Sequence, residues 1–553
     1  MRILFLAALA FAGSAGAGVE HPLVMLRFAS SQTRSIAEWK GTAKALAENP
    51  GCCNDVWFST GESFPSLDWH REHLRCLRVA AEDVRKLGIQ ASLQFEATIG
   101  HGDNFPTAEE RKIFESSWTG WTGPDGKECV YCNCPRQSAF LKRLAEVSAI
   151  YAEIRPAVVW IDDDLRPTNH FPATGEDGPG CWCATCVAAF AAEEKRDWTR
   201  ETLRTDYRRD AALRERWYDF SSRSLAEVAC TIARAFRKVS PTTRMGLQTG
   251  VDRNRMTPIV VRALAAATGE KVAVRMGGGS YYDTFAPQAG IENSVLMADT
   301  RRRLVLEDVV GNWCTEIESY PRAYGSRSVR SVAIEAFTSL GWGFDTVSAF
   351  VIDRRSETDA FYSRYLLRPL RSVAAFLEGY RAANRGTEPA GLVCSGMDFK
   401  DMRRLMGLPI LPGLGRSWGE VSAEREAFPG LGAVWGDFRP DLMPSFEMTP
   451  SAKVQSVRDR LSASAPLEVL SPFVGLVLPR VTATGELRTI GLVGTRMDEQ
   501  EDVVIRIAAD CKAAVWNELG RPPLQLAVET FAGSRQVKVP AIGAWNVGYI
   551  DLR

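Results

Sequence analysis

The stretch "AVVWIDDD", residues 157–164, combines the pattern of a buried strand with three consecutive carboxylates at its end. The helix-like stretch "SAFLKRLAEVSAIYAEI" (138–154) precedes it, and this alternation of a short apolar strand with an amphipathic helix recurs along the chain. Such alternation predicts an α/β fold of the (β/α)₈ TIM-barrel type. The predicted strands cover residues 22–29, 55–63, 91–98, 157–164, 244–250, 271–279, 313–321 and 346–353.

Nearly every predicted strand ends in polar or charged residues. Because parallel barrel strands all end at one rim, and catalytic groups collect at that rim, these residues are candidates for a shared site. They are Arg27, Glu62, Glu96, Asp164, Gln248, Arg275, Glu318 and Asp353.

The chain of 553 residues exceeds one ordinary core, so several domains are expected. We predict the barrel over residues 19–385. A small mixed α/β domain follows over 386–465. A C-terminal all-β sandwich is predicted over 466–553, where short apolar runs alternate with turn residues.

Charge and the first residues indicate the compartment and the partners. The chain carries 67 basic and 67 acidic residues, and this balance argues against nucleic acid or an anionic membrane as the partner. Residues 1–18 have the pattern of a signal peptide, with Arg2, an apolar run and small residues at its end. That run is too short to span a bilayer of about 30 Å, so we expect a secreted or periplasmic protein without a membrane span.

The three aspartates have a chemical interpretation. Strand alternation predicts that Asp162 and Asp164 point to one side and Asp163 to the other. Like charges raise the pKa of one of them, and a carboxyl that holds its proton near neutral pH can act as a general acid. A Ca²⁺ or Mg²⁺ site, or a solvated triad paired with Arg166, are the alternatives.

The seventh predicted strand, "WCTEIESYP" (313–321), supplies complementary acids. Glu316 and Glu318 are two residues apart and therefore share a face of the strand. Retaining glycoside hydrolysis requires two carboxyl groups about 5 Å apart, one as acid/base and one as nucleophile. Because strands four and seven face each other across a barrel mouth, the pattern predicts a carboxylate on each side of a sugar.

The barrel region resembles clan A glycoside hydrolases, and in particular family 42 β-galactosidases, over about two thirds of the chain. In that family a fourth-strand motif W/Q-V-x-N-E is followed by a C-x-C-x-x-C…F segment. Here "WIDDD" (160–164) is followed by "CWCATCVAAF" (181–190). The resemblance implies that Asp163 contacts the sugar and that Asp164 is the acid/base.

The same resemblance implies that Glu318, three residues before Pro321, is the nucleophile, with Glu316 as the second choice. Asp replaces both the Asn and the Glu of the fourth-strand motif, so the acid side chain is one methylene shorter. Either the sugar lies closer to the strand, or a longer separation makes the reaction inverting. The sugar is therefore not inherited from the family, and galactose is only the default.

The resemblance also implies a structural zinc held by Cys181, Cys183 and Cys186, with Cys134 as the fourth ligand and Cys132 as the second choice for it. Disulfides are the alternative, because an exported protein meets an oxidising environment. No organic cofactor is expected.

Further substrate contacts are expected from strand-end residues and aromatic side chains. The five histidines lie in no Ser/His/Asp or H-E-x-x-H pattern, which disfavours a serine nucleophile or a catalytic zinc. The substrate-binding candidates are Arg27, Trp57, Glu96, His101, Asp162, Gln248, Arg275 and Tyr281, with Trp342 as a second residue that could stack on a sugar ring.

The sequence thus predicts an exported, exo-acting, retaining glycoside hydrolase. Glu318 would attack the anomeric carbon, Asp164 would protonate the leaving oxygen, and Asp163 with Arg275 would hold the sugar. Two alternatives remain open: a catalytically degenerate barrel that binds carbohydrate, and a metal-dependent sugar lyase or isomerase that uses the aspartates. The partner is a carbohydrate, and homo-oligomerisation is left open.

Overall fold

The computed structural model describes most of the barrel and the C-terminal domain. The predicted signal peptide lies outside the described residues. These are residues 22–61, 65–100, 118–168, 178–250, 255–277, 288–319, 327–351, 362–395, 410–413, 434–435 and 467–553.

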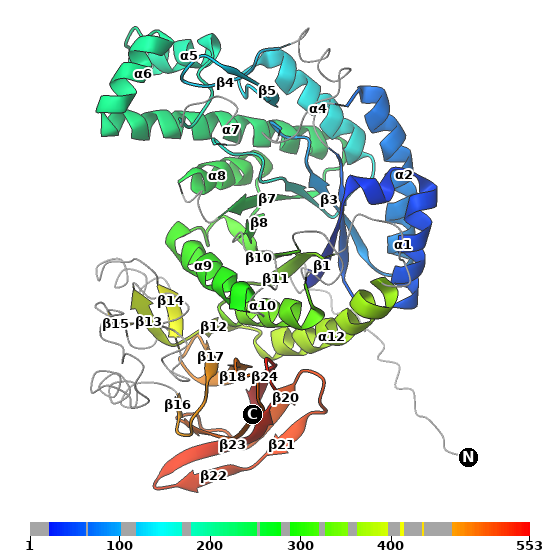
Figure 1. The fold of residues 1–553 in the computed structure, drawn as a ribbon, viewed down its shortest axis with the longest axis vertical. Coiled ribbons are helices and arrows are strands. Elements are labelled where there is room, and N and C mark those ends of the chain that lie inside the picture. The colour runs from blue at the N-terminus through cyan, green and yellow to red at the C-terminus, as the bar shows by residue number, and fades with distance from the viewer. Residues whose placement is uncertain are drawn as a thin grey trace.

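Eight parallel strands form a closed barrel, which confirms the predicted fold class (Figure 1). Each of the eight predicted strands contributes one barrel strand, and the last pairs with the first to close the sheet. Around the barrel the order is β1-β11-β10-β8-β7-β6-β3-β2. The strands are β1 (Val24–Phe28), β2 (Asp55–Ser59), β3 (Gln90–Phe95), β6 (Val158–Ile161), β7 (Arg244–Gly250), β8 (Val272–Gly277), β10 (Val310–Glu318) and β11 (Thr346–Phe350).

Helices surround the barrel on the outside (Figure 1). Several begin where a Ser or Asp side chain accepts a hydrogen bond from a first-turn backbone N–H, as Ser35, Ser66, Asp210 and Ser328 do. The surrounding helices are α1 (Ile36–Glu48), α2 (Leu67–Lys86), α4 (Ser138–Ala152), α7 (Ala211–Val239), α8 (Met256–Thr268), α9 (Gln288–Leu304), α10 (Val329–Gly341) and α12 (Arg368–Ala383).

Two insertions extend the barrel beyond this ring. A hairpin of β4 (Gly120–Thr122) and β5 (Glu128–Asn133) follows β3, and α5 (Ala184–Glu194) with α6 (Arg200–Arg209) follows β6. Figure 1 shows the hairpin and these helices together at one end of the molecule.

The barrel interior is filled by aromatic side chains. Trp57 and Trp160 stack with their ring centroids 4.2 Å apart, and both are fully buried. The neighbouring strand carries Gly246, where an added Cβ would come within 2.5 Å of the Trp160 ring. Such layers of side chains make a barrel of this kind a packed core rather than a pore.

The C-terminal part forms the predicted β-sandwich. A six-stranded sheet and a four-stranded sheet enclose a separate apolar core that includes Val477, Ile490, Ile505 and Trp516. The strands are β16 (Leu467–Val469), β17 (Gly475–Thr482), β18 (Leu487–Gly494), β19 (Gln500–Ile507), β20 (Ala514–Glu518), β21 (Leu524–Leu526), β22 (Val528–Phe531), β23 (Ser534–Ile542) and β24 (Val547–Leu552).

Residues between the barrel and the sandwich contribute to two sheets. β12 (Thr387–Pro389) pairs with β17 and so extends the sandwich, although the sequence placed it in the small middle domain. β13 (Leu392–Ser395), β14 (Ile410–Gly413) and β15 (Val434–Trp435) form a separate parallel sheet. Among the described residues, no helix combines the length and the apolar composition needed to cross a bilayer.

The buried carboxyl of Asp55 should make stability depend on pH. Asp55 begins β2 at the end of the barrel opposite the rim, and burial raises its pKa to about 7 despite a hydrogen bond from Ser92. A raised pKa favours the folded state while the carboxyl is protonated, so this contribution is full below pH ~4 and is lost as the pH rises through ~7.

Asp55→Asn keeps an acceptor for Ser92 but does not titrate. We expect its free energy of unfolding, measured in urea, to exceed that of the wild type by a margin that grows from pH 4 to pH 8, to about 4 kcal/mol at most. Asp498→Asn, at a carboxylate that is 80% exposed, is the control and should follow the wild-type curve. Parallel curves for Asp55→Asn and the wild type would contradict this role for Asp55.

Candidate active site

Carboxylates from the fourth and seventh barrel strands meet around two buried arginines at the rim. Arg275 Nη1 lies 2.8 Å from Glu316 Oε1 and 3.8 Å from Asp163 Oδ2. Arg27 Nη1 lies 2.6 Å from the same Glu316 oxygen and 3.8 Å from Glu318 Oε2. One set of guanidinium groups therefore joins acids that are far apart in the sequence. We call Arg27, Gln94, Asp162–Asp164, Gln248, Arg275, Glu316 and Glu318 the rim cluster.

Two glutamines connect the arginines to Asp162. Gln94 accepts from Arg27 Nε at 3.0 Å and donates to Asp162 Oδ2 at 2.6 Å. Gln248 accepts from Arg275 Nε at 3.1 Å and donates to the same Asp162 oxygen at 3.3 Å. Asp162 is buried and belongs to this framework, so its contacts support the other acids of the rim cluster.

The aspartates do not alternate as predicted, because the strand ends at Ile161 and the chain then turns. Leu165 N donates to the carbonyl of Asp162 at 3.1 Å, and Asp164 N donates to the Asp162 carboxylate at 3.2 Å. This turn brings oxygens of all three carboxylates within 4.8 Å of one another. The prediction that Asp163 points away from the other two was therefore wrong.

Asp164 has the electrostatic environment of a proton donor. Burial raises its pKa well above the usual value, and the charges of Asp162 and Asp163 add to this effect. Arg166 opposes it from 3.2 Å. The alternative of a solvated triad paired with Arg166 is thus correct for the contact but not for the solvation, because Asp164 is largely buried. A carboxyl that keeps its proton near neutral pH meets the first requirement of a general acid.

The two glutamates on β10 differ in their surroundings. Glu316 is held between Arg27 and Arg275, and its side chain is only 2% exposed. Burial raises its pKa, and both arginines oppose the shift. Glu318 is the last residue of the strand, and its side chain is 11% exposed. Glu318 is thus the more accessible of the two to a ligand at the rim.

A buried ion pair lies behind Glu318. Arg327 Nη1 donates to the backbone carbonyl of Glu318 at 2.8 Å. Arg327 Nη2 pairs with the carboxylate of Glu335, a fully buried residue of α10. Burial raises the pKa of Glu335 to about 7, an effect that Arg327 opposes. On α9, a Cβ at Gly290 would come within 2.9 Å of the Glu335 carboxylate, so a glycine leaves room for the pair.

Four buried cysteines form a group beside the turn after β6. Sulfur atoms of Cys134, Cys181, Cys183 and Cys186 lie within 4.8 Å of one another. Cys134 is 3.6 Å from Cys183 and 3.5 Å from Cys186, close to the ~3.8 Å between thiolates that surround a metal at about 2.3 Å. These separations exceed a disulfide bond of about 2.05 Å, and the four are free thiols.

The cysteine group fits a metal better than the alternatives. The group consists of four buried sulfur atoms at separations that suit a shared metal ion, which binds cysteine as the thiolate. Cys132, the second choice for the fourth ligand, instead bonds to the carbonyl of Gly100 at 3.5 Å. The four-cysteine group can therefore hold a metal ion.

The remaining predicted residues have different outcomes. Glu96 accepts from Ser59 at 2.6 Å, and its charge reaches Asp164. Stacking of a sugar on Trp57 or Trp342 was a wrong prediction, because both rings are buried in apolar packing. His101 and Tyr281 lie outside the described residues.

The sequence analysis missed one member of the rim cluster, Gln94, and one glycine that the cluster requires, Gly277. Gln94 belongs to β3 and lies two residues before Glu96, so the alternation of the predicted strand 91–98 placed it on the same face as that candidate. Gly277 lies two residues after Arg275 on β8. A Cβ added at Gly277 would come within 2.4 Å of Glu316 Oε2. A glycine there admits the glutamate to the cluster.

Comparisons with known proteins agree on the fold. No family model and no curated protein sequence matches this chain. Among solved structures, α-L-fucosidase isoenzyme 2 from Paenibacillus thiaminolyticus matches with a TM-score of 0.55 and 11% identity, over 96% of this chain and 100% of that one. A β-galactosidase from Bacillus circulans sp. alkalophilus matches at 0.56 and 10%, over 96% and 99%. A catalytic mutant of a GH42 β-galactosidase from G. stearothermophilus matches at 0.57 and 10%, over 96% and 98%.

These proteins share a barrel architecture with this chain over nearly their full lengths. The predicted likeness to family 42 β-galactosidases is thus confirmed for the fold. Identities this low leave the activity to be argued from the site itself.

The Arg327–Glu335 pair can be tested with a double-mutant cycle. Arg327→Met leaves a carboxyl buried without its partner and should lower the free energy of unfolding by about 3–5 kcal/mol. Arg327→Met combined with Glu335→Leu should recover most of that loss, because no buried charge remains. Urea unfolding measures the free energy of unfolding of the single and the double variant.

The surface pair of Arg223 and Glu193, whose side chains are 48% and 47% exposed, is the matched control. Its coupling should be about 1 kcal/mol or less. Additive effects at Arg327 and Glu335 would show that the two residues do not act as a pair.

Proposed function

We propose that this protein is a retaining glycoside hydrolase in which Asp164 is the acid/base and Glu318 the nucleophile. The observation that carries the proposal is the meeting of fourth-strand and seventh-strand carboxylates around Arg27 and Arg275. Retaining hydrolysis needs such a pair on opposite sides of one sugar.

The roles follow from the surroundings of each acid. Glu318 would attack the anomeric carbon while Asp164 gives its proton to the departing glycosidic oxygen. Asp164, now ionised, would then take a proton from water as that water displaces Glu318 from the sugar. Arg27, whose Nη1 lies 3.8 Å from Glu318 Oε2, would give electrostatic support to the Glu318 carboxylate.

Asp163 and Arg275 are assigned to holding the sugar. Asp163 is the most exposed of the three aspartates, with 27% of its side chain accessible, and it faces Arg275. A carboxylate and a guanidinium side by side offer an acceptor and a donor to neighbouring hydroxyl groups. Glu316 would keep Arg275 and Arg27 in place beneath the sugar.

The substrate and the compartment belong to the proposal. Two of the similar structures are β-galactosidases and one is an α-L-fucosidase, so terminal galactosides and fucosides are the first substrates to test. We infer exo-action from the same comparison. Export to the periplasm or the medium is inferred from residues 1–18.

We also propose that the four-cysteine group holds a structural zinc. The group contains no water-accessible ligand position that the four thiolates leave open, since a Cys₄ set completes tetrahedral coordination. The metal would fix the segment after β6, where Trp182 N also donates to the carbonyl of Thr122 at 2.7 Å.

A second candidate function rests on the Asp162–Asp164 turn. Its three carboxylates lie close enough to share one divalent cation, as a metal-dependent lyase or isomerase would need. Arg166 and Arg275 already neutralise part of this charge, which favours the hydrolase. Sugar binding without turnover would instead indicate a degenerate barrel.

Substitution of the two proposed catalytic acids should abolish turnover. We expect Asp164→Asn and Glu318→Gln each to lower kcat/KM on methyl glycosides or disaccharides, whose leaving oxygen must be protonated, by about 10²–10⁴-fold or more, since the first removes proton transfer and the second removes nucleophilic attack. A calorimetric titration with the sugar should show that binding persists. Normal turnover in both variants would exclude this assignment.

Azide distinguishes Glu318 from Glu316. In Glu318→Gly, azide should restore turnover and yield a glycosyl azide of inverted configuration, because it enters from the face that the nucleophile occupied. Glu316→Gly, the matched variant two residues away, should lose activity without rescue. Rescue of Glu316→Gly alone would make Glu316 the nucleophile.

Chelation separates a structural zinc from a catalytic cation. Elemental analysis should find one zinc per chain, and Cys183→Ser should lose it and lower the melting temperature. Brief treatment with a chelator such as EDTA should leave kcat unchanged while the zinc remains bound. Immediate loss of activity that Mg²⁺ or Ca²⁺ restores would favour the metal-dependent alternative.

A further inference from the structure

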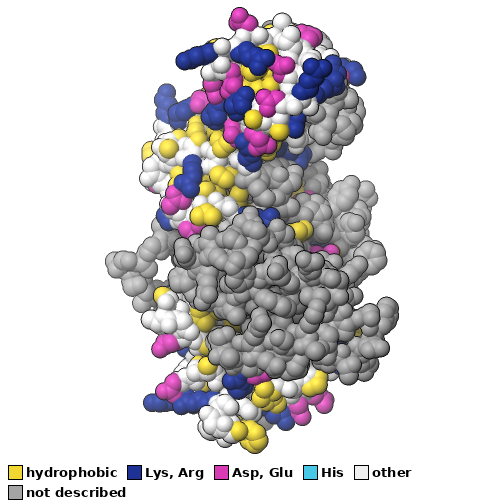
Figure 2. All heavy atoms as spheres, turned by 90° about the vertical axis from the view of Figure 1, so that its left-hand side faces the viewer, with side chains coloured by type: hydrophobic (Ala, Val, Ile, Leu, Met, Phe, Trp, Pro, Cys, Tyr) yellow, Lys and Arg dark blue, Asp and Glu magenta, His cyan; other side chains and the backbone are white. Residues whose placement is uncertain are grey.

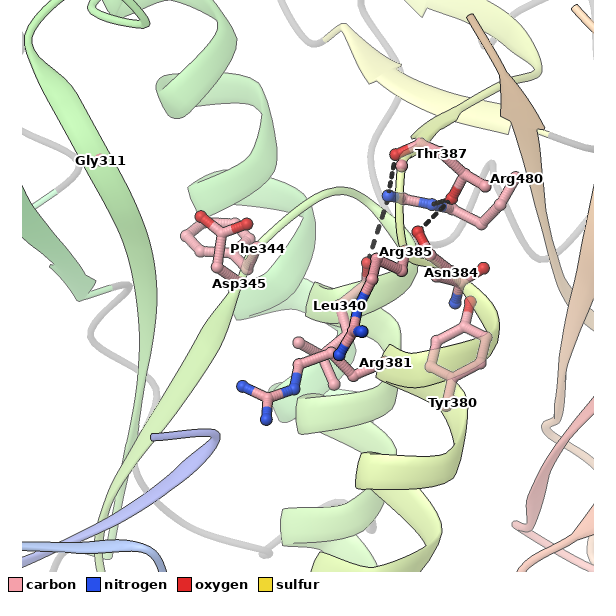
Figure 3. A pocket seen from close by; sticks show the side chains of 11 residues that line it. Gly311, Leu340, Phe344, Asp345, Tyr380, Arg381, Asn384, Arg385, Thr387 and Arg480 are labelled. Carbon is pink, nitrogen blue, oxygen red and sulfur yellow. Dashed lines mark hydrogen bonds between the residues drawn. The ribbon is translucent and has the colours of Figure 1, made fainter. Parts of the chain in front are cut away.

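A cavity lies at the opposite end of the barrel from the rim cluster. It has a volume of about 280 Å³ and is bounded by the start of β10, the turn between α10 and β11, the end of α12 and the sandwich strand β17. Figure 3 shows Phe344 and Asp345 on one side of it and Arg381 and Arg385 on the other. It is therefore separate from the proposed catalytic acids.

The lining of this cavity carries an excess of positive charge. Arg381, Arg385 and Arg480 line it together with one acid, Asp345. Glu378 pairs with Arg381 at 2.7 Å and compensates part of that charge. The guanidinium of Arg480 remains the main buried charge at the wall.

Arg480 is held by neutral oxygens. It is 8% exposed, and its nitrogens donate to the side chain and carbonyl of Thr387 at 3.1 and 2.6 Å and to the carbonyls of Leu340 and Gly341 at 3.4 Å. These bonds orient the guanidinium but supply no negative charge. A buried cation held this way favours an anion beside it, because paired charges are the ones that low-dielectric sites stabilise.

The charges around Arg480 do not remove its preference for an anion. Burial is the largest influence on Arg480 and, with the nearby Arg301, lowers its pKa to about 10, whereas Asp345 and Glu388 act in the opposite sense. Arg480 therefore stays protonated at neutral pH. Figure 3 shows its hydrogen bonds at the edge of the cavity.

The cavity also has apolar walls. Leu340, Phe344 and Tyr380 are nearly or fully buried and contribute side-chain surface to it. Its volume lies just below the usual range for small-molecule sites, about 300–1,000 Å³, and therefore suits a body no larger than one sugar ring. An apolar wall with a cationic edge matches a ligand that has one apolar face and one anionic group.

We propose that this cavity binds a small organic anion, a carboxylate or sulfate carried on a body the size of one sugar ring. Arg480 and Arg385 would receive the anionic group, and the Phe344 side would receive the ring. The site is independent of the proposed hydrolase activity, because it shares no residue with the rim cluster.

Titration calorimetry on the full chain tests the site. The probes are D-glucuronate and D-galactose 6-sulfate, with D-galactose and inorganic sulfate as references at equal ionic strength. We expect the acidic sugars to bind at least ~10-fold more tightly than galactose and than inorganic sulfate. Whichever of glucuronate and galactose 6-sulfate binds more tightly shows whether the site prefers a carboxylate or a sulfate. Affinity no tighter than that of inorganic sulfate overturns the proposal, as does equal affinity for galactose at a site that responds to Arg385→Gln.

Variants assign the binding to this cavity. Arg385→Gln, at an exposed lining residue, should weaken binding at least ~3-fold, whereas Asp345→Asn should tighten it by a similar factor. Asp345 accepts from Trp313 N at 2.8 Å, and Asn preserves that bond. Arg371→Gln, at an exposed residue of α12, the helix that precedes Arg385, is the matched control and should leave the affinity unchanged.

The opposite responses keep this test independent of stability. A variant that is merely destabilised would bind the anion more weakly. Tighter binding by Asp345→Asn would therefore have to come from removal of the negative charge. Unchanged affinity in both variants, or weaker binding by Asp345→Asn, overturns the assignment whether or not the protein hydrolyses glycosides.

Discussion

The barrel rim depends on one buried carboxylate, Glu316, held between the guanidinium groups of Arg27 and Arg275. Buried charges are stable only when each has its partner, and loss of this carboxylate would leave two guanidinium groups unpaired in a low-dielectric site. The three residues come from different strands of the closed barrel. Two glutamines extend the same network to Asp162, so that acids on opposite strands are positioned by one set of contacts.

The more exposed acids are supported from outside this network. The Arg327–Glu335 pair holds the backbone of Glu318 from α10, and the four-cysteine group lies beside the segment that follows the aspartates. The proposed catalytic role of these acids would need such a second layer, because small displacements of a catalytic side chain cost activity. The last turn of α10 also borders the cavity beneath the barrel, through Leu340. The helix thus connects the rim with the junction to the sandwich.

Local patterns in the sequence were sufficient to predict the barrel strands, the acids at their ends and most of the cysteine group. Each predicted barrel strand exists, because alternating strands and helices have distinct periods that persist whatever the packing. Strand ends indicated Glu318 and Asp164 as acids of one rim, since all parallel strands end on the same side. The spacing of Cys181, Cys183 and Cys186 indicated a ligand group, and Cys134 joins it.

Contacts that depend on closure of the barrel were decided only by the tertiary structure. Trp57 points into the interior, and a burial pattern cannot tell an inward apolar side chain from an outward one that lies under a helix. The turn after Ile161 gathers the aspartates because Asp162 accepts from a backbone N–H, a local choice that competes with strand extension. The sequence by itself determined the eight barrel strands and which acids stand at their ends. Only the tertiary structure decided that Gln94 and Arg327 support those acids, because their partners lie on strands and helices that meet when the barrel closes.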